Sequence, residues 1–314
     1  MTKRIAKLRM AVGDVSRRPI RAAVGGDLDR LRAQLGGLEC RHVAQLESHE
    51  IARAEFQVFS QFGEDGIIQF LVQRVPIENS TFVELGVGDY SESNTRFLLV
   101  HDNWRGLVVD SGHAMHRFLD SSDLSWRHDI HPVAAFIDRD NVDELIRRAG
   151  IEGDIGLLSI DLDGNDYWIL EAIDAVSPRI LVTEYNSTFG AEAAVTVPYD
   201  AGFVREQKHW SALYWGASLA AITKLAGEKG YALVGGNRAG NNAFYVRRDV
   251  LGSIPEVGVR GAYALSRFRE SRSQNGELSY VSDHAERLRL IASLPLVDVD
   301  RGDESTVAEL FDLD

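Results

Sequence analysis

Four acidic residues stand at the ends of short apolar runs in the middle of the chain. They are Glu84 in the run 81–85, Asp110 after 106–109, Asp161 after 156–160 and Glu184 after 179–183. Runs of this length and composition are typical of buried strands, and because helical segments separate them they predict a parallel sheet. The carboxyl ends of parallel strands meet at one edge, where open α/β sheets bind their ligands. We therefore expect these four carboxylates to lie together at one binding edge.

The first of these strand ends carries a glycine turn, Glu84-Leu-Gly-Val-Gly-Asp89. Gly86 and Gly88 let the backbone turn tightly and let a ligand approach it closely. The turn lacks the third glycine of a dinucleotide-phosphate loop, and Asp89 stands near the place of the pyrophosphate, so a cationic ligand suits the turn better. Asp110 follows Gly86 by 24 residues, close to the spacing of about 20 at which an acid binds ribose hydroxyls.

The densest acidic segment, Asp161-Leu-Asp-Gly-Asn-Asp166, allows three interpretations. In the first it is structural: Asp161 binds cofactor or backbone, and Asn165 or Asp166 caps the following helix. In the second it holds a hard divalent cation such as Mg²⁺, with oxygen ligands from two neighbouring strand ends. The metal ligands predicted in that case are Asp161, Asp163, Glu184 and Asn186. In the third, Asp161 and Asp163 form the Asp-x-Asp pair of a metal-dependent glycosyltransferase.

The segments around these residues predict a mixed α/β domain. Strands are expected over 81–85, 106–110, 132–137, 156–160, 179–183, 231–234 and 242–246, and helices over 91–101, 141–149, 167–176 and 217–229. The last two strands are joined by too few residues for a crossover helix, so they should pair antiparallel. The chain then divides into a basic arm with a leucine-bearing helix (1–55), this domain (56–250) and a C-terminal extension (251–314).

Composition and charge exclude several classes of protein. The 314 residues are 45% hydrophobic and 26% charged, as in soluble globular proteins. A net charge of −13 argues against nucleic-acid binding, and no apolar run is long enough for a transmembrane segment. Cys40 is the only cysteine and cannot form an internal disulfide, and the N-terminus lacks the apolar stretch of a secretory signal. We therefore expect a cytoplasmic protein.

The N-terminal part combines a basic arm with a leucine-bearing helix. Residues 1–24 hold seven basic side chains and one acid, which suits a solvated tail or docking on an acidic partner or an anionic membrane surface. The segment 27–55 has no proline, and one face of a helix there would carry Leu28, Leu31, Leu35 and Leu38. We expect this face either to pack on the main domain or to pair with a second copy in a homo-oligomer.

In their order, these motifs resemble class I S-adenosylmethionine-dependent methyltransferases, and most of all the FkbM-type family. The matching segments are Ser60-Gln-Phe-Gly-Glu-Asp65, the glycine turn at 82–89, Gly106–Asp110, Leu158–Asp166 and Ile180–Asn186. The resemblance implies a Rossmann-like sheet of strand order 3-2-1-4-5-7-6 with the last strand antiparallel. It implies that S-adenosyl-L-methionine is held by Gln61, Asp65, Glu84, Gly86, Gly88, Asp110 and Asp161, with Asp110 on the ribose hydroxyls.

A connection of about 30 residues between Asn186 and Ala217 is long enough for a lid or a binding loop. Its aromatic and polar side chains suit a sugar-like acceptor, or else the aromatic rings only pack the loop down. His209 is the expected general base because its ordinary pKa is near neutral, with His131 and Asp163 as rivals. We expect O-methylation of a small hydroxylated acceptor such as a sugar or glycoconjugate. A metal-dependent glycosyltransferase and a non-catalytic assembly module are the alternatives.

Overall fold

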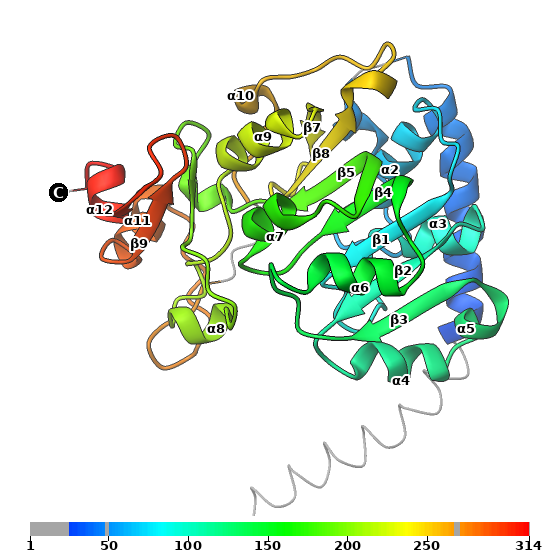
Figure 1. Cartoon of the computed structure of the whole chain (residues 1–314), viewed down its shortest axis with the longest axis horizontal. Helices are drawn as coiled ribbons and strands as arrows, with labels where there is room; N and C mark the ends of the chain where they lie inside the picture. The colour runs from blue at the N-terminus through cyan, green and yellow to red at the C-terminus, as the bar shows by residue number, and fades with distance from the viewer. Residues whose placement is uncertain (1–24, 48–49, 267–270, 314) are drawn as a thin grey trace, which may run out of the picture.

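The computed structural model describes residues 25–47, 50–266 and 271–313, and its centre is a seven-stranded sheet (Figure 1). The strands, in spatial order, are β3 (Ile130–Ala134), β2 (Arg105–Asp110), β1 (Thr81–Leu85), β4 (Gly153–Ile160), β5 (Val176–Glu184), β8 (Asn242–Arg247) and β7 (Tyr231–Gly236). Neighbours from β3 to β5 are parallel, and β8 is antiparallel to both β5 and β7. The order and the antiparallel strand are those predicted, with β7 and β8 as the expected sixth and seventh strands.

Helices cover both faces of the sheet. One face packs against α2 (Glu64–Val72), α3 (Arg96–His101) and α4 (Ala114–Asp120), and the other against α6 (Val142–Arg148), α7 (Asp166–Ala172) and α9 (Leu219–Glu228). Successive side chains of a strand point to opposite faces, so Phe82 joins the first layer and Val83 the second. This double burial explains why the central strands are continuous apolar runs. None of the described helices combines the length and the apolar character that a membrane span requires.

Shorter helices and 3₁₀ turns lie in the connections between these elements and in the C-terminal part of the chain. They are α5 (Leu124–Arg127), α8 (Arg205–Lys208), α10 (Val259–Ala262), α11 (His284–Leu290), α12 (Val307–Leu310) and the 3₁₀ turns Ile51–Ala54, Ser187–Phe189 and Arg248–Val250. A second, three-stranded sheet joins β6 (Val195–Thr196), β9 (Pro295–Asp298) and β10 (Asp303–Thr306). Because β6 belongs to the long connection after β5, the C-terminal part of the chain packs on that connection.

Several expected elements begin or end elsewhere; the helix predicted over 167–176, for example, ends at Ala172, and Val176 already begins β5. Two of these differences have a visible cause. The helix predicted over 91–101 begins at Arg96, because the carboxylate of Glu84 accepts hydrogen bonds from the backbone of Asn94 and Thr95 and holds that stretch as a loop. The strand predicted over 132–137 spans 130–134, because its partner β2 ends at Asp110, which pairs with Ala134. In both places a tertiary contact sets the boundary.

The N-terminal helix, residues 25–44, lies along the domain with its leucines turned outward. The buried face is instead formed by small residues, among them Gly36, Cys40 and Val43. A methyl group on Gly36 would collide with the side chains of Val58 and Phe97, so glycine permits the close approach. The expectation that the leucines pack on the domain is therefore wrong, although the helix itself does pack there.

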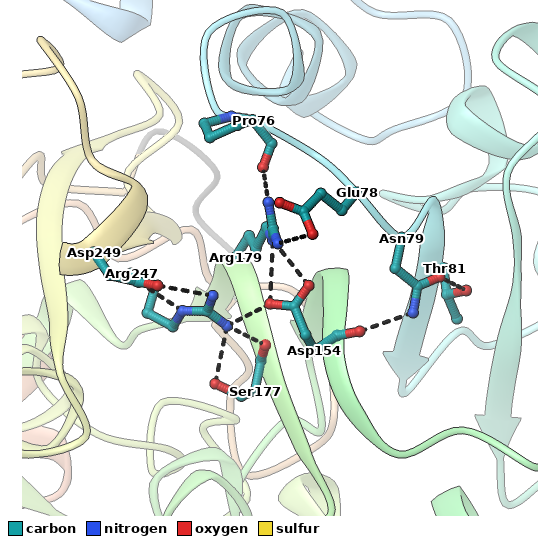
Figure 2. A network of polar contacts seen from close by, with 9 residues as sticks. All are labelled: Pro76, Glu78, Asn79, Thr81, Asp154, Ser177, Arg179, Arg247 and Asp249. Atoms are coloured by element: carbon teal, nitrogen blue, oxygen red, sulfur yellow. Dashed lines mark hydrogen bonds and ion pairs between the residues drawn. The ribbon is translucent and has the colours of Figure 1, made fainter.

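The edge of the sheet opposite the expected site is tied together by ion pairs (Figure 2). Arg179 of β5 is buried and its guanidinium lies 2.9 Å from the carboxylate of Asp154 at the start of β4. Arg247, at the end of β8, lies 2.8 Å from the same carboxylate and 2.7 Å from that of Asp249. Arg179 also donates to the carbonyl of Pro76. These ion pairs link β4, β5 and β8, because the antiparallel β8 ends beside the starts of β4 and β5.

Candidate functional site

A cavity of about 440 Å³ opens at the carboxyl ends of β1, β2 and β4. On one side its walls come from the predicted strand ends, with Gly86, Asp110 and Asp161. On the other side they come from segments far away in the sequence, namely Gln61 and Glu64 before β1, the loop 91–94, Asn165, the stretch 203–206 and Asn242. The volume is that of a small-molecule site. The predicted binding edge is therefore hollow.

The glycine turn shapes the first wall. Gly86 has φ +84° and Gly88 has φ +55°, values that L-residues with a side chain rarely adopt. A methyl group on Gly86 would overlap the carbonyl of Asp161, because β1 and β4 close on each other there. A methyl group on Gly88 would meet nothing within 4 Å. Gly86 thus serves the closure of the sheet edge, whereas Gly88 keeps the cavity side of the turn open.

Asp110 lies beside this turn. Its Oδ2 accepts a hydrogen bond from the Gly88 amide (2.9 Å), and its Oδ1 accepts one from the Gly112 amide (2.8 Å). The side chain is partly exposed and lines the cavity. Each carboxylate oxygen has a second lone pair that a ligand hydroxyl can use. The structure thus brings together Gly86, Gly88 and Asp110, as the spacing predicted.

Glu84 is in the wall, but its carboxylate is already occupied. It accepts from Ser93 Oγ (2.6 Å), the Asn94 amide (2.8 Å), and both the Oγ1 (2.5 Å) and the amide of Thr95. Burial raises the pKa of Glu84, and these hydrogen bonds oppose the shift. Glu84 thus positions the loop that forms one side of the cavity, and its expected contact with the cofactor stays a prediction.

Gln61 and Asp65, both predicted to hold the cofactor, differ in whether they line the cavity. Gln61 lines the cavity, and its amide lies 3.3 Å from the carboxylate of Glu92. Asp65 is fully buried outside the cavity walls, where its Oδ2 accepts from the amides of Val58, Phe59 and Ser60 at 2.7–2.8 Å. Burial raises the pKa of Asp65 to about 6, against the pull of these hydrogen bonds. Asp65 therefore shapes the entry loop and, contrary to expectation, does not face a ligand.

Asp161 and Glu184 form a buried carboxyl pair at the ends of β4 and β5. Their side chains share a hydrogen bond, and Asp161 lines the cavity. Burial, followed by the negative charges of neighbouring carboxylates, raises the pKa of both groups well above the ordinary range. Two carboxyl groups in hydrogen-bond contact hold a proton between them. Oε2 of Glu184 is buried and has no partner among the described residues.

The predicted metal ligands do not converge on one point. Asn186 donates from Nδ2 to the carbonyls of Leu213 (3.0 Å) and Trp215 (2.9 Å), and its Oδ1 accepts from the Thr188 amide. Its amide is thus consumed by the fold. The carboxylate of Asp163 lies 2.7 Å from Arg205. Among the residues that the structure describes, no three His, Cys, Asp or Glu side chains come together as a metal-binding group. The site does not fit Mg²⁺.

Within the acidic segment, Asp166 is the structural residue. Its carboxylate accepts from the amides of Leu162 (2.8 Å) and Gly164 (3.1 Å), and burial raises its pKa to about 6. Asn165 occupies the N-cap position of α7, but its side chain makes no capping hydrogen bond. The segment is therefore a loop held by Asp166 from inside, rather than a capped helix start.

The two histidines considered as general bases lie outside the cavity walls. Nδ1 of His209 is 2.7 Å from Ser211 Oγ, and its ring lies against Trp210. Burial lowers the pKa of His209. His131 is on β3 at the far edge of the sheet, 3.1 Å from Asp129. Since neither is among the residues that line the cavity, the structure corrects the choice of His209, whereas Asp163 does line it.

Two asparagines that were not selected as site residues from the sequence line the cavity. Asn165 donates from Nδ2 to the Asp200 carbonyl (2.8 Å), and Asn242 donates from Nδ2 to Glu64 Oε1 (3.0 Å). A carbonyl and a carboxylate only accept, so both amides have a fixed orientation. Their Oδ1 atoms are buried and accept from no described residue. For Asn242, the Gly/Asn-rich turn between the last two strands was the available signal.

The long connection after β5 is mostly packed rather than open. Its aromatic side chains are buried in a cluster with the C-terminal part of the chain; they include Phe189, Phe203, Tyr214 and Trp215. Only the stretch 203–206 reaches the cavity, where Arg205 is placed between the carbonyl of Ala212 and Asp163. Packing therefore accounts for most of the aromatic residues, and a short part of the connection forms a wall of the site.

No protein-family model matches the chain, and no curated protein matches its sequence. An S-adenosylmethionine-dependent methyltransferase structure from Clostridium acetobutylicum aligns at 12% identity over 58% of this chain and 89% of its own, with a TM-score of 0.36. A putative O-methyltransferase from Nostoc punctiforme aligns at 12% identity over 58% and 55%, with a TM-score of 0.37.

A third structure is an O-methyltransferase from neocarzinostatin biosynthesis in complex with S-adenosylmethionine and 2-hydroxy-5-methyl naphthoic acid. It aligns at 17% identity over 54% of this chain and 49% of its own, with a TM-score of 0.32. This chain thus spans about half the length of the two O-methyltransferases. Scores and identities this low say nothing about its reaction or its ligand.

Proposed function

We propose that the protein is an S-adenosylmethionine-dependent methyltransferase that methylates a hydroxyl group of a small acceptor, with a sugar or glycoconjugate as the first class to test. The proposal rests chiefly on one observation. An open glycine turn and the Asp110 carboxylate form one wall of a small-molecule cavity at the carboxyl edge of this sheet. The sequence resemblance to class I methyltransferases, centred on the same residues, adds support.

The half of the cavity next to β1 and β2 suits the cofactor. Asp110 is available to ribose hydroxyls, Gly88 offers an unobstructed backbone, and the stretch 135–137 forms an apolar wall. Acidic side chains predominate around the cavity, which favours a ligand with a net positive charge. When bound there, the cofactor would supply an electrophilic methyl group carried on a sulfonium. The protein's part is then to position an acceptor in line with it and to exclude water.

The half next to β4 and β8 suits a hydroxylated acceptor. Oδ1 of Asn165 and Oδ1 of Asn242 are buried acceptors without donors from the described residues. Leaving such atoms unpaired is costly, so an acceptor whose O–H groups reach them would gain hydrogen bonds there. Asp163 at the same wall is our candidate for the group that accepts the hydroxyl proton, and Arg205 fixes the direction of its carboxylate.

The first test is calorimetric binding of S-adenosylmethionine and S-adenosylhomocysteine, with UDP-sugars alongside, each with and without Mg²⁺. We expect micromolar binding of the first two, independent of Mg²⁺. Asp110→Ala should weaken it at least about tenfold, since two charged hydrogen bonds are lost. Asp120→Ala, which removes an exposed acid at the end of α4, is the matched control and should bind as the wild type does.

Other outcomes separate the alternatives. Binding of UDP-sugars in place of the methionine nucleosides would replace this proposal with a glycosyltransferase. Folded protein that binds none of them would favour an assembly module. Once the cofactor is established, transfer of a labelled methyl group to a panel of sugars and polyols should depend on Asn165 and Asn242. Turnover unchanged in Asn242→Leu would remove the hydroxylated-acceptor part of the proposal.

A further inference from the structure

The outward face of the N-terminal helix carries a row of exposed leucines, called here the leucine face. Leu28, Leu31, Leu35 and Leu38 are 48%, 56%, 62% and 56% exposed. Their spacing of three, four and three residues is that of the a and d positions of two heptads. Within the part of the chain that the structure describes, no side chain covers this face. Apolar residues scattered singly need no explanation, but an ordered stripe on one helix does.

The helix is fixed to the domain through its opposite face, so the leucines cannot turn inward. Gly36 lies against Val58 and Phe97, and Cys40 is buried beside it. At the helix start, Arg96 holds the carboxylate of Asp29 at 2.6 Å. At the helix end, Arg74 donates to the carbonyl of Leu46 at 2.8 Å. The inner face is occupied at both ends and in the middle, and the leucine face is left as a rigid, preformed surface.

We propose that the leucine face is a dimerisation seam whose occupant is the same helix of a second copy of this chain, running parallel to it. The residues that flank the seam support this occupant by charge. In a parallel pair, a g position faces the e position five residues further along the other helix. Asp27 of one copy then faces Arg32 of the other, and Gln34 faces Glu39. The Asp27 and Arg32 side chains are 72% and 60% exposed, and each pairs within its own helix, Asp27 with Arg30 at 3.1 Å and Arg32 with Asp29 at 3.5 Å. Exposed pairs of this kind are worth little, so both side chains can exchange them for a partner across the seam.

The other arrangements are less favourable. An antiparallel pair with the same leucine layers brings Arg32 next to Arg32 of the second copy, where like charges repel, although it also brings Asp27 next to Arg41. The parallel pair has the attractive contact without the repulsive one. An anionic lipid surface would favour cations on both sides of the apolar stripe, whereas Asp27 and Glu39 flank it here. The seam also allows the two domains to lie on opposite sides, because the domain-facing residues are on the far side of the helix from the leucines.

The test is sedimentation velocity of the full chain between about 1 µM and about 100 µM, the range expected for a seam of only two heptads. We expect a species of twice the 34.8 kDa chain mass to grow with concentration. Leu31→Glu/Leu35→Glu should raise the dimer dissociation constant at least about 100-fold. Arg117→Gln/Ala44→Glu adds the same negative charge at exposed positions off the seam and should leave the dimer unchanged. Circular dichroism confirms that both double variants are folded.

A second variant tests the direction of the pair. In a parallel dimer Leu38 faces Leu38 of the other copy, so Leu38→Cys should cross-link to itself under mild oxidation, whereas the wild type, with Cys40 buried on the inner face, should not. A wild-type chain that stays monomeric throughout would overturn the proposal, as would a dimer that survives Leu31→Glu/Leu35→Glu. Flotation with phosphatidylserine vesicles that is lost in this variant, without a dimer, would assign the leucine face to a lipid surface instead.

Discussion

The two glycines of the turn after β1 allow a prediction with opposite outcomes at neighbouring positions. Gly86→Ala should mainly cost stability, and Gly88→Ala should mainly cost ligand binding. Both residues have positive φ, and a side chain in the left-handed region costs about 1–2 kcal/mol. At Gly86 the new methyl group would also lie 2.7 Å from the carbonyl carbon of Asp161, well inside van der Waals contact.

The magnitude follows from what must move. The Asp161 backbone is held by a hydrogen bond from its amide to the Leu85 carbonyl (3.0 Å), so the collision strains the closure of β1 on β4. Overpacking of this kind adds about 1–3 kcal/mol. We expect Gly86→Ala to lower the free energy of unfolding by about 2–5 kcal/mol. For Gly88→Ala, where nothing lies within 4 Å, the loss should be about 1–2 kcal/mol.

Urea denaturation and calorimetry with S-adenosylhomocysteine measure the two effects separately. The methyl group at Gly88 projects into the cavity, so the dissociation constant should rise at least about tenfold in Gly88→Ala even though the protein remains folded. Equal losses of stability in the two variants would refute the assignment of Gly86 to the sheet closure. Unchanged affinity in Gly88→Ala would refute the assignment of Gly88 to the ligand side.

Four further predictions concern the rest of the fold. Arg179→Met should lower the free energy of unfolding by only about 1–2 kcal/mol, because the Pro76 carbonyl loses a donor while the partly exposed Asp154 keeps Arg247 as its partner, and thermal denaturation measures the change. The pKa of Asp65 is raised from 3.8 to about 6, so its contribution to stability is complete below pH 3.8 and is lost as the pH rises through about 6. The stability advantage of the wild type over Asp65→Asn should therefore shrink by up to about 3 kcal/mol across that interval, and a constant difference in urea midpoints would contradict the shift. Gly36→Ala should destabilise the protein despite alanine's higher helix propensity, whereas Gly37→Ala, with only a side-chain atom of His101 at 3.2 Å, should be neutral or stabilising in thermal melts. EDTA should leave nucleoside binding and melting temperature unchanged, and a loss that Mg²⁺ restores would revive the metal site.

Predicting the sheet from the sequence succeeded because its signals are local. Apolar runs ending in acids mark parallel strands buried on both faces, and the short link before Asn242 requires an antiparallel pair. The glycine turn and Asp110 came together as predicted, because parallel neighbours in register bring their strand ends to one edge. These features depend on periodicity and chain length, which a single sequence contains.

The roles of the acids could not be predicted, because they depend on which donors surround each carboxylate. Glu84 and Asp65 have the residue type of a ligand-binding group, yet amides and hydroxyls from loops that the fold brings to them bond mainly to one oxygen of each carboxylate, Glu84 Oε2 and Asp65 Oδ2. Asn186 stands at the predicted strand end, yet its amide holds the long connection. His209 has a suitable ordinary pKa, but its loop carries it away from the cavity. Nothing in the spacing of these residues indicates such partners.

The sequence by itself determined the α/β sheet, its antiparallel last pair and the edge at which ligands would bind, and the family resemblance implied the strand order. Only the tertiary structure decided which polar groups remain unsatisfied there, among them those of Asn165, Asn242 and Glu184, and which are consumed by the fold. It also decided that the leucines face outward, since the small residues around Gly36 allow the helix to approach the domain more closely than leucine could. The physical reason is the same in both cases: periodicity defines a face or an edge, whereas occupancy depends on contacts between residues distant in the sequence.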